Sequence, residues 1–117
     1  MHLRFPKYGN LTKATDNMRY SDFNILLSHD PSHWRGEVLQ KFPHIHLTLS
    51  GHTHGFQFGV DIPGFRWSPV QYVYREWAGL YTEGHQHLYV NKGLCFLGYP
   101  GRVGMLPEIS VFELERA

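Results

Sequence analysis

Three histidines have the residue type and spacing of metal ligands. His52 and His54 belong to Gly51-His52-Thr53-His54-Gly55, and His29 follows a short apolar run. Two histidines at i and i+2 on an extended backbone point to the same side, and the flanking glycines let the chain turn sharply near an ion. Neutral imidazole is a good ligand for divalent transition metals. The other six of the nine histidines have no such pattern, and we expect ordinary surface or hydrogen-bonding roles for them.

Two predicted strands position these histidines. Residues 23–28 form a nearly continuous apolar run, typical of a strand buried on both faces. Residues 31–41 follow as a predicted helix that starts at a proline, and residues 44–50 alternate as a second strand. This order predicts a crossover between parallel strands. His29 would then lie beside His52 and His54 at the carboxyl edge of the sheet, where sites in α/β proteins gather.

The second half of the chain has a different character. It contains most of the 12 glycines, with short β-like segments between them. Residues 80–90 predict a hairpin, and residues 108–115 alternate as a closing strand. The aromatic-rich residues 67–81 are interpreted as core rather than as a substrate groove or lipid contact. The predicted class is therefore α/β in the first half, and β-rich with long loops in the second.

Composition excludes several functional classes. The 117 residues suffice for one domain, and a formal net charge of +1 gives no signature of nucleic-acid binding. A single cysteine excludes an internal disulfide or a multi-cysteine zinc site. No secretion signal or membrane-spanning run is present, so the default expectation is a soluble, cytoplasmic protein, although a longer protein could be membrane-anchored.

Four segments together resemble a known family. Residues 26–31, 47–55, 89–94 and 101–109 are similar to the calcineurin-like metallophosphoesterases, in the bacterial branch of predicted phosphohydrolases. The resemblance runs from about residue 23 to residue 114 and implies a β-sandwich flanked by helices. It also implies two divalent metals (manganese, iron or zinc) whose bridging hydroxide attacks a phosphoester. By position, His29 and His52 would bind the second metal and His54 the first.

Two further residues are candidate substrate ligands by the same resemblance. Arg102 lies in a glycine- and proline-rich loop that the resemblance places near the pocket, where a guanidinium could bind a phosphate oxygen. The alternative is a solvent-facing loop arginine. Asn91 is a weaker candidate, for which we favour a structural role.

The earlier motifs of the family have no counterpart in these 117 residues. None of the four aspartates is followed by histidine two residues later, no Gly-Asp pair occurs, and Gly9-Asn10 is followed by Leu11. We therefore expect no catalytic histidine and no bridging carboxylate in this chain. Residues 1–117 are interpreted as a single, incomplete domain, the C-terminal half of a longer enzyme, inactive or impaired alone. The surface left by the missing half favours self-association.

Two other readings stay open. The chain could be a non-catalytic module in which His29, His52 and His54 bind one zinc ion. It could also be an interaction fragment whose histidines have lost their role.

Overall fold

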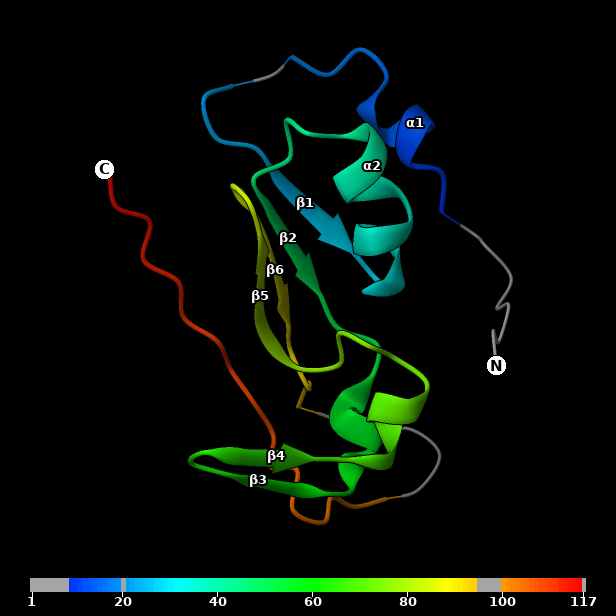
Figure 1. Ribbon diagram of the computed structural model, residues 1–117, viewed down its shortest axis with the longest axis vertical. Coiled ribbons are helices and arrows are strands. Elements are labelled where there is room, and N and C mark those ends of the chain that lie inside the picture. Colours follow the sequence, from blue (N-terminus) through cyan, green and yellow to red (C-terminus); the bar gives the residue numbers. More distant parts are fainter. Residues whose placement is uncertain (1–8, 20, 95–99, 117) are drawn as a thin grey trace.

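A four-stranded, mostly parallel sheet forms the centre of the computed structural model, which describes residues 9–19, 21–94 and 100–116 (Figure 1). The strands are β1 (Ile25–Ser28), β2 (Leu47–Ser50), β6 (Gln86–Val90) and β5 (Gly79–Glu83), in that spatial order. β1, β2 and β6 are parallel, and β5 is antiparallel to β6. The predicted parallel pair and the predicted hairpin are both confirmed, and the α/β class with them.

Helices cover one face of this sheet. Residues 32–41 form one continuous helix, whose parts are η1 (Trp34–Val38) and α2 (Leu39–Lys41). Trp34 and Val38 lie four positions apart on one helix face and are buried in the same cluster as Leu88 and Val90 of β6. The short helix α1 (Leu11–Thr15) adds Leu11 to the same core. It ends at Thr15, and the chain then turns through Asn17, whose φ is left-handed.

The opposite face of the sheet is partly open. Ile25 and Leu27 of β1 are 45% and 78% exposed, so the prediction of a strand buried on both faces is wrong. β1 is one of the two edge strands, and its outward side chains have no covering layer among the described residues. An apolar run reveals strand formation but not which strand lies at the edge.

The residues between β2 and β5 form a smaller unit at the carboxyl end of the sheet. It contains η2 (His54–Gln57), β3 (Val60–Ile62), β4 (Phe65–Trp67) and η3 (Pro69–Tyr72). β3 and β4 pair as a two-stranded antiparallel sheet. A separate apolar cluster forms here, from Val70, Tyr74, Trp77, Ala78 and Met105. The interpretation of the aromatic stretch as core is confirmed for Tyr74 and Trp77 and is wrong for Tyr72, which is 75% exposed.

The predicted closing strand at residues 108–115 does not form. This segment runs alongside the sheet without pairing in a ladder (Figure 1). Both edges of β6 are already occupied, by β2 and β5, so the tail contacts β6 through side chains instead. The Tyr89 hydroxyl donates to Glu108, and the Tyr89 ring packs edge-on against Phe112. An alternating segment that lies beside a strand with no free edge stays an extended chain and does not join the sheet.

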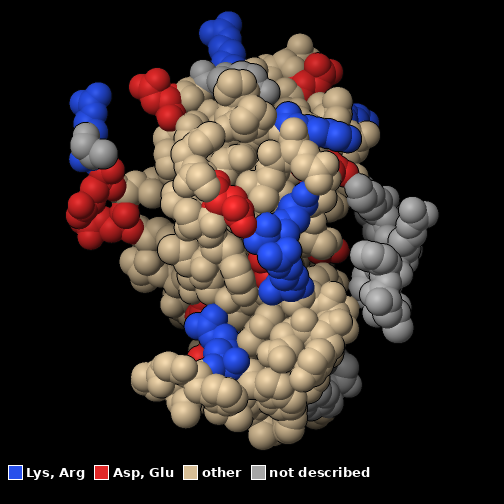
Figure 2. Space-filling model, in the orientation of Figure 1, with Lys and Arg blue, Asp and Glu red and all other residues tan. Residues whose placement is uncertain are grey.

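Charged side chains are dispersed over the visible surface. Figure 2 shows acidic and basic groups interspersed among large uncharged areas on this face. Among the described residues, no helix has the length and apolar character needed to cross a membrane.

Candidate functional site

The carboxyl ends of β1 and β2 bring His29 and His52 together. The parallel register pairs Ser28 with Ser50, so the residues that follow these two positions emerge side by side. The Ser50 hydroxyl donates to the His29 carbonyl at 3.1 Å, which links the two strand ends. The imidazole rings of His29 and His52 have centroids 4.5 Å apart. The predicted convergence is therefore observed for this pair.

The loop after β2 has an unusual backbone. Left-handed φ angles occur at five positions, namely His52, His54, Gly55, Phe56 and Gln57. Each such non-glycine residue costs about 1–3 kcal/mol and persists only where surrounding contacts hold it. Buried side chains supply those contacts. The Thr53 hydroxyl donates to the Trp77 carbonyl at 2.7 Å, and the Ser68 hydroxyl donates to the Gly55 carbonyl at 2.7 Å.

His54 presents a polar atom without a partner. Its Nδ1 is buried and makes no hydrogen bond among the described residues. A Cβ placed on Gly93 would lie 3.5 Å from this Nδ1 and 3.7 Å from an Arg102 guanidinium nitrogen, so a glycine keeps the space beside His54 open. A buried, unsatisfied nitrogen is costly and needs an explanation such as a bound ion. The donor chemistry of His54 fits a metal ligand.

His52 is held by a tyrosine. Its Nε2 lies 2.9 Å from the Tyr74 hydroxyl, and the two rings meet edge-on. Burial is the main cause of the lowered pKa of His52, and the neighbouring His29 lowers this pKa further. The carboxylate of Asp30 raises it but does not offset the other two effects. The neutral imidazole, which is the form that binds metal, is therefore favoured.

The three predicted ligands do not form a closed metal site. Within residues 9–19, 21–94 and 100–116, no group of three or more His, Cys, Asp or Glu side chains is arranged to bind one ion. The structure pairs His29 with His52 and places an orphaned nitrogen on His54. The residues present thus fit part of a metal site, and the carboxylates that would complete it are not among them.

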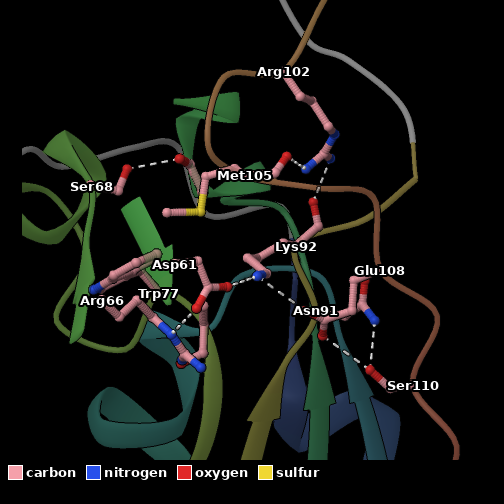
Figure 3. Close-up of polar contacts among 12 residues, drawn as sticks. Asp61, Arg66, Ser68, Trp77, Asn91, Lys92, Arg102, Met105, Glu108 and Ser110 are labelled. Atoms are coloured by element: carbon pink, nitrogen blue, oxygen red, sulfur yellow. Dashed lines mark hydrogen bonds and ion pairs between the residues drawn. The ribbon is translucent and has the colours of Figure 1, made fainter. Parts of the chain in front are cut away.

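Arg102 and Asn91 both make structural contacts near this loop (Figure 3). The Arg102 guanidinium donates to the Lys92 carbonyl at 2.7 Å and to the Met105 carbonyl at 3.2 Å. The Asn91 amide oxygen accepts from the Gly93 amide at 2.6 Å. Its NH₂ group donates to Ser110 at 2.8 Å.

Sequence reasoning missed two features. One is Tyr74, which was only a member of an aromatic stretch. The other is Lys92, whose ammonium is buried and contacts the carboxylates of Asp61 and Glu108 (Figure 3). Asp61 and Glu108 lie 31 and 16 positions away from Lys92 along the chain, and no local sequence pattern predicts contacts over such separations.

Comparison with known proteins places this geometry in a family context. No family model and no solved structure matches the chain. Curated proteins do match. An uncharacterized metallophosphoesterase of Bacillus subtilis, YkuE, is 38% identical over 112 residues, which cover 94% of this chain and 36% of that protein. A Danio rerio transmembrane protein with a metallophosphoesterase domain is 36% identical, over 98% of this chain and 25% of that protein.

A third relative has a more specific name. The phosphodiesterase YaeI of Escherichia coli is 37% identical over 93 residues, which cover 77% of this chain and 32% of that protein. The chain thus spans a quarter to about a third of the length of these relatives. The matches confirm the resemblance that the motifs indicated, and they identify the chain as a homologue of part of a metallophosphoesterase.

Proposed function

We propose that this chain supplies His29, His52 and His54 to the two-metal site of a phosphoester hydrolase. The observation that carries the proposal is the pairing of the His29 and His52 rings at the carboxyl edge of two parallel strands. The strained loop that follows β2 supports it, because this loop also carries His54, whose Nδ1 has no hydrogen-bond partner among the described residues. The names of the relatives support the same class of reaction.

In this proposal the three histidines of this chain bind the metal ions. Neutral imidazoles suit manganese, iron or zinc, and the lowered pKa of His52 favours its ligating form. When bound, such ions polarise a phosphoryl oxygen and generate a hydroxide nucleophile. Two divalent ions also need carboxylate ligands, to offset their charge. In our proposal these carboxylates and the catalytic histidine come from residues outside these 117, in a longer enzyme of which this chain is a part.

Arg102 is proposed to bind a phosphate oxygen of the substrate. Its guanidinium lies beside the space that Gly93 leaves open next to His54. Two backbone carbonyls hold it in that position, so its orientation does not depend on substrate. Asn91 contributes indirectly in this scheme, by shaping the turn that contains Gly93.

Metal titration of the chain tests the proposal. Calorimetry with Mn²⁺ and Zn²⁺ should detect binding to the wild-type chain, and His29→Ala or His52→Ala should abolish it. His85→Ala is the matched control, because His85 lies in the exposed hairpin turn at the other end of the sheet. Equal binding by all four proteins would refute the assignment. A single Zn²⁺ whose removal unfolds the chain would favour the structural-zinc alternative instead.

A chimera tests the reaction itself. This chain would replace the matching segment of the Escherichia coli phosphodiesterase YaeI, and bis(p-nitrophenyl) phosphate would serve as the substrate. Metal-dependent hydrolysis that is lost on His54→Ala and kept on His85→Ala would support the proposal. Hydrolysis that survives His29→Ala, His52→Ala and His54→Ala would contradict it.

A further inference from the structure

Tyr74 is fixed and aimed at one nitrogen of His52. Its side chain is 8% exposed and packs in the apolar cluster with Val70, Trp77 and Met105. The hydroxyl lies 2.9 Å from His52 Nε2, and the ring centroids are 5.6 Å apart at 87°. A buried tyrosine needs a hydrogen-bond partner for its hydroxyl, and His52 provides one.

A second contact fixes the same two segments. The Thr53 hydroxyl donates to the Trp77 carbonyl at 2.7 Å. Thr53 directly follows His52 in the sequence, and Trp77 lies three residues after Tyr74. The Tyr74 amide also donates to the Val70 carbonyl at 2.8 Å, which continues the turn of η3. The histidine loop and the segment with Tyr74 therefore meet at two adjacent points, and the position of the tyrosine does not depend on the imidazole alone.

We propose that Tyr74 is a positioning residue that accepts a hydrogen bond from His52 Nε2–H. A neutral imidazole carries one N–H, so this bond leaves the lone pair on Nδ1 for a divalent metal. Ligating histidines commonly use their second nitrogen in this way, which fixes both the tautomer and the ring orientation. The inference rests on the proposed function, because it assigns a role to a residue beside a proposed ligand.

The tautomer of His52 can be measured without metal. Long-range ¹H–¹⁵N spectra of the whole 117-residue chain report it, with the His52 signals assigned by their loss in His52→Gln. The wild-type chain should show the Nε2–H tautomer. In Tyr74→Phe the Nδ1 and Nε2 shifts of His52 should move toward a mixture of tautomers. A wild-type Nδ1–H tautomer would overturn the proposal, and so would unchanged shifts in Tyr74→Phe.

Zn²⁺ affinity gives the second measurement. Tyr74→Phe should weaken Zn²⁺ binding at least about 10-fold, as is usual when the group that orients a ligand is removed. Tyr72→Phe is the matched control and should bind as the wild type does. Tyr72 is 75% exposed, and its hydroxyl accepts only a long hydrogen bond, of 3.5 Å, from Trp67. Equal losses in both variants would overturn the proposal.

The two measurements separate this inference from the proposed function. If the wild-type chain binds no Zn²⁺ but shows the Nε2–H tautomer that Tyr74→Phe disrupts, the metal function fails and the positioning role stands. If Zn²⁺ binding depends on His52 but is unchanged in Tyr74→Phe, the positioning role fails and the metal function stands. The wild-type tautomer is read without Tyr74→Phe, so a folding defect of that variant cannot mask the result.

Discussion

Lys92 joins three parts of the chain through a buried ammonium. Its side chain is 8% exposed and contacts the carboxylate of Asp61 on β3 and, at 3.4 Å, that of Glu108 in the C-terminal segment. Asp61 also accepts from Arg66 at 3.4 Å. The hydrogen bond from Lys92 is the largest cause of the lowered pKa of Asp61. Asp61→Asn and Glu108→Gln remove each negative charge while preserving shape and an acceptor oxygen.

The expected magnitudes follow from burial. Breaking a fully buried ion pair costs about 3–5 kcal/mol, whereas an exposed pair is worth about 0–1 kcal/mol. The Asp61 side chain is 25% exposed, and Lys92 keeps Glu108 when Asp61 is neutralised. Asp61→Asn should therefore lower the free energy of unfolding by about 1–2 kcal/mol and Glu108→Gln by about 1 kcal/mol. The double variant leaves the buried ammonium without a counter-charge and should lose about 4–5 kcal/mol, more than the sum.

Urea unfolding followed by tryptophan fluorescence provides the assay, with Asp22→Asn at an exposed aspartate as the control. The Asp61 carboxylate should contribute its full stabilisation above the pKa that it has in the unfolded chain, about 4. This contribution should be lost as the pH falls through the lower pKa of Asp61 in the folded chain. Additive losses in the double variant would refute the coupled network.

Three further predictions concern the backbone, a helix cap and metal release. Gly36→Ala should raise the free energy of unfolding by about 0.5–1 kcal/mol, since Gly36 is helical with open space around it. Gly104→Ala should lower the thermal midpoint by about 10 °C or more, because its φ is +72° and a Cβ would lie 1.6 Å from the Gly59 carbonyl; an unchanged melting curve would contradict this. Ser68→Ala should cost about 1–2 kcal/mol in urea unfolding, because the buried hydroxyl caps η3. Zn²⁺ affinity measured by calorimetry should fall below about pH 6.5, as imidazoles protonate. The lowered pKa of His52 should shift the midpoint of that loss to more acidic pH, and binding that strengthens in acid would exclude histidine ligands.

Local patterns predicted the elements that frame the site. The helix over 31–41, the parallel strands on either side of it and the hairpin before Asn91 all form where spacing and turn residues indicated. The Gly51–Gly55 motif marked the candidate ligands, because glycines at a strand end permit the turn that brings imidazoles toward an ion. These features depend on residues within about one turn or one strand of each other.

Contacts between distant residues were decided only by the tertiary structure. An alternating segment such as 108–115 becomes a strand only beside a free edge, and β6 offers none. The open face of β1, the buried ammonium of Lys92 and the hydroxyl of Tyr74 on His52 likewise depend on which segments pack together. The sequence by itself determined the candidate metal ligands and the strand ends that carry them. The tertiary structure determined that two of them meet and which tyrosine contacts one, because packing joins residues that no local spacing relates.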